Sequence, residues 1–160
     1  MNEVLYILEL AVKTMFVKQS NIYSFTPESG LTEWNLAHHF ANEIALLYKD
    51  YNCDIEITKG ELESKRPDII VHRRGTHDNF LVLEIKKDGQ EGTIRGECEK
   101  VRTYWLAQLN YRYGAVVNFK GNKVGIIVID GNTNTEKSST VDALSQRPDL
   151  GLSTSSSVLE

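Results

Sequence analysis

The sequence predicts a single mixed α/β domain. Two helix-like segments come first, three strand-like segments follow, and a further helix and two strands complete the order α-α-β-β-β-α-β-β. The strand expected at residues 80–87 is apolar on both sides, which is typical of a central strand in a sheet covered on both faces. With 160 residues, 41% apolar and 25% charged, the chain has the length and composition of one globular domain with a core.

Three helices are expected from the spacing of apolar residues. The first covers residues 3–18, and a polar break follows it. The second is expected to have Thr32 as its N-cap and to continue to about Tyr51. The third covers residues 94–112.

The strands are expected in two groups, separated by the third helix. Segments rich in Gly, Lys, Asp and Asn separate the first three strands, and a turn at residues 120–122 joins the last two. The predicted strands are residues 54–58, 67–72, 80–87, 115–119 and 124–129. From residue 131 the composition changes to Asn, Thr and Ser, so we expect a folded domain over residues 1–130 and a polar tail over residues 131–160.

The charge and cysteine content exclude several classes of protein. The net charge is −4, which argues against binding nucleic acid by bulk electrostatics alone, although most of the 18 Lys and Arg residues lie between residues 59 and 112. Cys53 and Cys98 belong to no C-x-x-C pair, so neither a disulfide framework nor a zinc site is indicated. No apolar run is long enough to span a membrane and the start of the sequence lacks a secretory pattern. We therefore expect a cytoplasmic protein without a membrane partner.

One constellation of charged residues indicates chemistry. Pro67-Asp68 is followed by Glu84-Ile85-Lys86, and the two pieces lie on neighbouring predicted strands. Because side chains alternate along a strand, Glu84 and Lys86 share a face, and an adjacent strand can bring Asp68 alongside them. One or two carboxylates are enough to hold Mg²⁺ together with water and substrate oxygens. A nearby lysine can orient or deprotonate a water, or neutralise phosphate charge, so the group suits phosphodiester hydrolysis.

These residues and the elements around them resemble the PD-(D/E)XK nuclease superfamily. The resemblance extends over residues 31–119. The amino-acid sequences of residues 66–75 and 83–87 are similar to those of an uncharacterised bacterial branch of that superfamily. It implies a restriction-endonuclease-like fold, in which helices flank a central mixed β-sheet. It also implies a Mg²⁺-dependent nuclease that cleaves nucleic acid, with DNA the expected substrate and Mn²⁺ a possible substitute ion.

The resemblance assigns a role to each residue of the motif. Asp68 and Glu84 match the two metal-binding acids, the backbone carbonyl of Ile85 is expected to assist them, and Lys86 matches the catalytic lysine. Glu33 is the chosen acid on the preceding helix, because it lies in the apolar stripe, where an ionised carboxylate needs a cation or donor.

Each assignment has a structural alternative. Asp68 after a proline is typical of a turn, Glu84 and Lys86 could form an ordinary surface ion pair, and Glu33 in a first helical turn favours the helix dipole. Glu43 and Glu56 compete with Glu33 as the additional acid, although we interpret Glu43 as a solvated helix residue.

Five further residues are candidates for contact with a nucleic acid. Arg73 and Arg74 lie in the connection between two strands and could contact phosphate, and the later helix carries Lys100 and Gln108, with Tyr113 after it. Ordinary surface positions are the alternative for the arginines.

Two other classes of function stay open. The first is a catalytically silent binding or assembly module of the same fold, because a fold does not determine a function. The second is a partner-binding protein of a defence or mobile-element system. The resemblance further implies a homodimer, and a partner chain is the other source of specificity in a domain this small.

Overall fold

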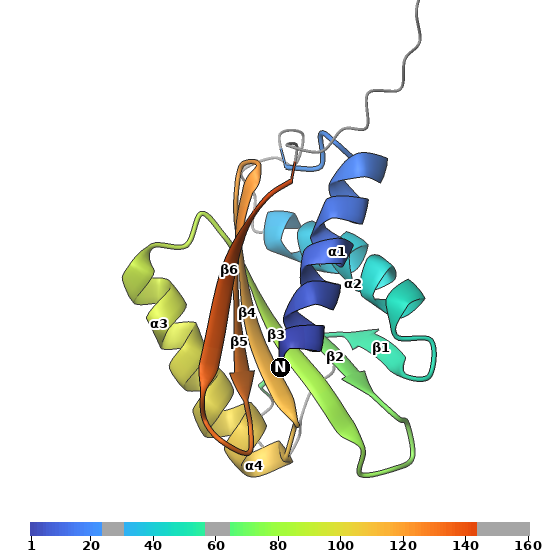
Figure 1. Cartoon of the computed structure of the whole chain (residues 1–160), viewed down its shortest axis with the longest axis vertical. Coiled ribbons are helices and arrows are strands. Elements are labelled where there is room, and N and C mark those ends of the chain that lie inside the picture. Colours follow the sequence, from blue (N-terminus) through green and yellow to red (C-terminus); the bar gives the residue numbers. More distant parts are fainter. Residues whose placement is uncertain (24–30, 57–64, 144–160) are drawn as a thin grey trace, which may run out of the picture.

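The computed structural model describes residues 1–23, 31–56 and 65–143, which form a mixed α/β structure around a six-stranded sheet (Figure 1). The general α/β class is thus as predicted. The helical elements are α1 (Asn2–Lys18), α2 (Leu31–Leu47), α3 (Glu91–Lys100), the π-helical turn η2 (Val101–Leu106) and α4 (Ala107–Leu109). The strands are β1 (Asn52–Ile55), β2 (Ile69–His72), β3 (Asn79–Lys87), β4 (Tyr113–Lys120), β5 (Lys123–Asp130) and β6 (Glu136–Asp142).

The strands lie in the sheet in chain order, from β1 to β6. All neighbouring pairs are antiparallel except β3 and β4, which are parallel. Parallel neighbours need a crossover connection, and α3, η2 and α4 provide it between β3 and β4. The β3 strand lies inside the sheet, and its residues from Leu81 to Ile85 are buried, as predicted for a central strand.

The helices cover both faces of the sheet (Figure 1). On one face α1 packs on β5 and β6 while α2 packs on β1 and β3, and the core between them includes Leu8, Phe40 and Phe119. On the other face the α3 and η2 segment packs through Val101 and Trp105. The Glu84 side of β3 therefore faces α3 and η2, and the Ile85 side faces α1 and α2.

The predicted helices are present, with differences at the second and third. The third was expected over residues 94–112, whereas the helical stretch begins at Glu91, passes through a π-helical turn and ends at Leu109. Since α2 already includes Leu31, the expected N-cap at Thr32 is wrong, and the residues before it lie outside the described part. The helix also ends at Leu47 and not at Tyr51. Tyr51 lies in the turn that leads to β1, where its ring stacks on Phe80 at a centroid distance of 4.8 Å.

The predicted strands are present as well, with shifted ends, and the structure adds one. The segment before residue 54 is already extended, since β1 begins at Asn52, while residues 57 and 58 of the predicted first strand lie outside the described residues. The predicted element order has no strand after residue 130, and this is wrong. The sixth strand, β6, lies in the segment expected to be a polar tail and pairs with β5 along its whole length. Within β6 only Val141 is buried, as is typical of a strand at the solvent-exposed edge of a sheet.

None of the helices in the described ranges has the length and apolar character needed to cross a bilayer.

Candidate functional site

The predicted acids meet where β2 begins, beside the last third of β3. Ile69 pairs with Leu83 in the antiparallel ladder, so Asp68, one residue earlier, lies across from Glu84. The backbone N–H of Ile85 donates to Oδ2 of Asp68 at 2.6 Å. Asp68, predicted as a metal ligand, is thereby fixed against the Glu84-Ile85-Lys86 strand.

Glu84 is a buried carboxylate with a partner on each oxygen. Its side chain is 1% exposed. The indole N–H of Trp105 donates to Oε1 at 2.7 Å, and the ammonium of Lys100 donates to Oε2 at 2.8 Å. Burial and the negative charge of Asp68 outweigh these donors and raise the pKa of Glu84 to about 7.

Asp68 has the same electrostatic character in a milder form. Burial raises its pKa above the ordinary value, although the Ile85 amide and the charges of Lys86 and Lys100 act in the opposite direction. Among the described residues, no hydrogen bond reaches its Oδ1 atom. Two neighbouring carboxyls with raised pKa values form a place where additional positive charge is stabilising.

Lys86 lies between two acids from different elements. Its ammonium is 3.4 Å from Oε2 of Glu33 on α2 and 3.6 Å from Oε1 of Glu97 on α3. Burial alone lowers the pKa of Lys86, but the attraction of Glu97, Glu33 and Asp68 is larger in sum and leaves the pKa raised. Lys86 is therefore held as an ammonium ion at the edge of the acidic pair.

Glu33 joins this group from the opposite side of the sheet. In addition to Lys86, its carboxylate accepts the backbone N–H of Lys87 at 3.0 Å, so α2 is tied to the end of β3. The argument from the apolar stripe anticipated that a donor or cation would meet Glu33. The side chain is nevertheless 41% exposed, so it lies at the margin of the core and not in its centre.

The residues present are compatible with a cation on Asp68 and Glu84. Among the described residues, no three acidic, His or Cys side chains gather closely enough to hold a metal. Mg²⁺ needs only one or two carboxylates, since waters and substrate oxygens complete its shell. Oδ1 of Asp68 could contribute directly, whereas Oε2 of Glu84 would first have to exchange its contact with Lys100.

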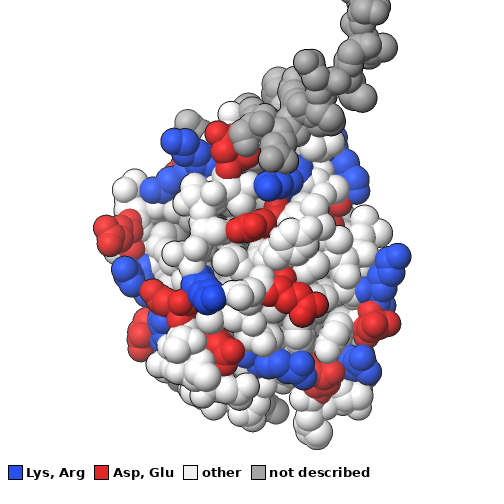
Figure 2. Space-filling model, viewed as in Figure 1, with Lys and Arg blue, Asp and Glu red and all other residues white. Residues whose placement is uncertain are grey.

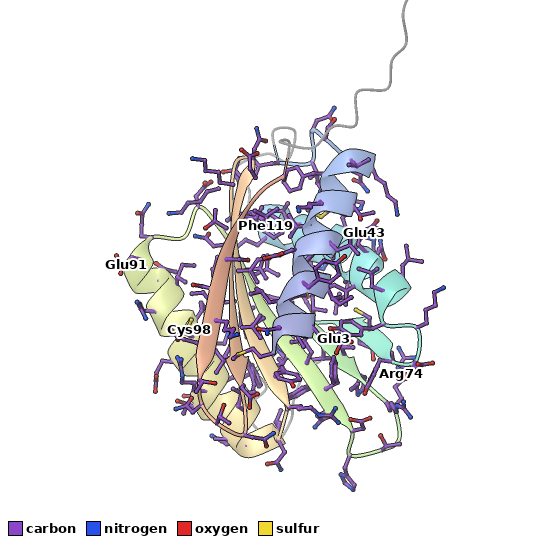
Figure 3. All side chains as sticks on the ribbon, viewed as in Figure 1. Glu3, Glu43, Arg74, Glu91, Cys98 and Phe119 are labelled. Atoms are coloured by element: carbon purple, nitrogen blue, oxygen red, sulfur yellow. The ribbon has the colours of Figure 1, made fainter. Side chains whose placement is uncertain are left out.

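Neither competing acid joins the site. Glu43 is 8% exposed, with an ion pair of 2.8 Å to Lys18, so its interpretation as a solvated residue was wrong. It is buried because α1 packs against this side of α2, and Figure 3 shows Glu43 at that contact. The carboxylate of Glu56 pairs with Arg66 at 3.3 Å. The backbone N–H of Glu56 donates to the carbonyl of Asp68 at 3.0 Å, but among the described residues no ion pair or hydrogen bond joins its carboxylate to Asp68 or Glu84.

The two arginines predicted to contact nucleic acid lie at the other end of β2. Five residues of extended chain, about 16 Å, separate Arg73 from Asp68. Arg73 pairs with Asp78 at 3.4 Å, and Arg74 makes an ion pair with Asp54. Figure 3 shows Arg74 near the turn between β2 and β3, away from α3. The structure therefore does not bring these arginines to the acidic pair.

The remaining candidates divide between two locations. Lys100 contacts Glu84 directly and so belongs to the site itself. Gln108 donates to the carbonyl of Thr103 and faces solvent. Tyr113 lies on the other face of the sheet, where its ring packs edge-on against Phe80.

Sequence reasoning missed two members of the site. Glu97 contacts both Lys86 and Lys100, at 3.6 and 3.4 Å. Trp105 is buried, and its indole N–H donates to Glu84, a contact that the sequence did not indicate. For Glu97 the sequence does contain one signal: it lies three residues before Lys100, a helical spacing at which two side chains meet.

Comparison of the chain with protein-family models and with curated proteins finds no match.

Proposed function

We propose that this protein is a metal-dependent nuclease that hydrolyses phosphodiester bonds of nucleic acid, with DNA as its substrate. The observation that carries the proposal is the meeting of the half-buried Asp68 with the buried Glu84 as neighbouring carboxyls, with the ammonium of Lys86 on the same strand as Glu84. Paired acids can bind a hard cation, and a lysine beside them can assist the phosphoryl transfer that such a cation promotes.

The arrangement of elements supports the resemblance to the PD-(D/E)XK superfamily. An acid-bearing helix precedes three antiparallel strands, and a helical crossover then leads to a parallel strand. The proposed restriction-endonuclease-like fold agrees with this order. The two motif pieces face each other across β2 and β3, as that assignment requires.

Each residue has a defined task in the proposed reaction. Asp68 and Glu84 would hold Mg²⁺ or Mn²⁺, with help from the carbonyl of Ile85. When bound, the ion supplies activation of a water and neutralisation of charge at phosphorus. Because Glu33 and Glu97 keep Lys86 protonated, Lys86 is suited to donate hydrogen bonds to the water or to a phosphate oxygen, and not to remove a proton.

The surface charge bears on how nucleic acid would be bound. Figure 2 shows Lys and Arg interspersed with Asp and Glu on the face in view, so among the residues described this face has no uniformly basic surface. Binding would then depend on the cation and on a few local cations, and not on a long electrostatic patch. A homodimer or a partner chain would enlarge the binding surface, which measurement of the mass in solution can test.

The direct test is cleavage of single-stranded and double-stranded DNA and of RNA in the presence of Mg²⁺ or Mn²⁺. Asp68→Ala and Lys86→Ala are each expected to lower the rate by about 100-fold or more, since each removes a group that acts on the reacting phosphate. Lys123→Ala, at an exposed position on β5, is the control and should cleave like the unmodified protein. Undiminished cleavage by both site variants would refute the assignment.

A second candidate is a catalytically silent module of the same fold. It is favoured by the fact that both oxygens of Glu84 are already satisfied by Lys100 and Trp105. Titration calorimetry with Mg²⁺ and Mn²⁺ distinguishes the two, because the nuclease must bind the ion and the silent module need not.

A further inference from the structure

We propose that Lys100 is a built-in competitor for the divalent cation, and that its ammonium group occupies the cation-binding oxygen of Glu84 until an ion displaces it. This inference rests on the proposed function, because it assumes that the ion binds to Asp68 and Glu84. It assigns to Lys100 a regulatory role in the same site, in place of the contact with nucleic acid predicted from the sequence.

The contact geometry supports this role. The Nζ atom of Lys100 is 2.8 Å from Oε2 of Glu84, and its charge also acts on Asp68. Lys100 is thus the positive charge shared by the two carboxyls expected to hold the ion. Lys86, the lysine of the motif, is instead paired with Glu33 and Glu97.

The two oxygens of Glu84 have different partners, which makes exchange possible. Trp105 is buried and fixed in the core, so its hydrogen bond keeps Oε1 oriented. Lys100 has a long flexible side chain and is 31% exposed. Oε2 can therefore be vacated while the carboxylate keeps its direction.

A second acid is available to Lys100 when it leaves Glu84. Glu97 lies one helical turn earlier on α3, and its Oε2 is already 3.4 Å from Nζ of Lys100. The ammonium can shift toward Glu97 without losing every anionic partner, so displacement by an ion of higher charge does not leave a lone buried cation. The same neighbour keeps Lys100 beside the site.

The test measures the affinity for the ion itself, by titration calorimetry of the whole chain with Mn²⁺ and Mg²⁺. Lys100→Met removes the competing charge and keeps most of the side-chain volume, and we expect it to bind Mn²⁺ about tenfold more tightly, which corresponds to about 1.4 kcal/mol. Lys100→Arg keeps the charge and adds a forked donor, so it should bind the ion about threefold more weakly or worse.

The chain offers a matched control. Lys18 also pairs with a buried glutamate, Glu43, at 2.8 Å, but this pair joins α1 to α2 on the other face of the sheet. Lys18→Met should lose folding stability as Lys100→Met does, and yet bind Mn²⁺ with unchanged affinity. Thermal unfolding with and without Mn²⁺ gives a second readout, in which the ion should raise the unfolding temperature of Lys100→Met more than that of Lys18→Met.

The outcomes separate this inference from the proposed function. Tighter Mn²⁺ binding by Lys100→Met than by the unmodified protein supports both this inference and the proposed function. Mn²⁺ binding by Lys100→Met but not by the unmodified protein would also support both, because it would show that Lys100 blocks the site completely. If the unmodified protein binds Mn²⁺ and Lys100→Met binds it within about twofold or more weakly, Lys100 does not compete, although the nuclease proposal stands. If no variant binds either ion, both proposals are wrong.

Discussion

Replacing Glu84 by Gln is expected to remove a pH dependence of folding stability that this buried carboxyl creates. In the folded protein its pKa is about 7, and the ordinary value is 4.5. Between these two pH values the folded chain keeps a proton that the unfolded chain has released. Stability conferred by the protonated group is therefore complete below about pH 4.5, falls as the pH rises through 7, and is lost above it.

The size of the effect follows from the gap between the two pKa values. At about 1.4 kcal/mol for each pH unit, the gap between 4.5 and about 7 corresponds to about 3 kcal/mol. Because Glu84 is only 1% exposed, solvent screening takes little from this figure. Gln has the same shape and no titrating proton, so Glu84→Gln should lack this component.

The assay is urea unfolding followed by circular dichroism, between about pH 4 and about pH 8, with a chelator present. The free energy of unfolding of the unmodified protein, minus that of Glu84→Gln, should fall by about 3 kcal/mol over this range. Taking the difference cancels the titration of the acids that do not interact with Glu84, whereas Asp68 is coupled to it. Parallel stability profiles for the two proteins would refute the description of Glu84 as a buried acid with a raised pKa.

Two further substitutions test the surroundings of the site. Trp105→Phe removes the donor to Oε1 of Glu84 and should cost about 1–3 kcal/mol of unfolding free energy at about pH 8, and less at about pH 5, where the carboxyl is protonated; an equal loss at both pH values would contradict this. Gly114→Ala should cost about 1–3 kcal/mol in the same assay, because the new Cβ would meet Cγ1 of Val101 at 2.2 Å. Gly125→Ala, on the neighbouring strand and with open space around its Cβ, is the control and should stay within about 1 kcal/mol of the unmodified protein; equal losses in the two variants would refute the packing argument.

The elements that follow a strong apolar period could be predicted from the sequence. The α1 helix buries Val4, Leu8 and Met15, as the helical spacing indicated. The β3 strand is central because it is apolar on both sides. The edge strand β6 could not be found in this way, since its seven residues are mostly Ser, Thr and charged, and backbone pairing with β5 is what makes them a strand.

The candidate site was predictable only in part, for a related reason. Strand alternation places Glu84 and Lys86 on one face whatever the rest of the chain does, and the ladder brings Asp68 across from them. Lys100 and Trp105 reach Glu84 only through the packing of a helix on the sheet, which no local pattern encodes. Glu43 shows the same limit, because its burial depends on α1 lying against α2.

The π-helical turn between α3 and α4 determines how many donors Glu84 can receive from one helix. In an α-helix, residues five positions apart point about 140° away from each other, so Lys100 and Trp105 would face different directions. The i→i+5 winding of Val101–Leu106 inserts the equivalent of one residue and turns the two side chains toward a common direction. Deleting a single residue from this turn would separate the ammonium from the indole while leaving both in the chain. The π-helical turn thus allows one short stretch of backbone to direct two hydrogen-bond donors, Lys100 and Trp105, at the carboxylate of Glu84.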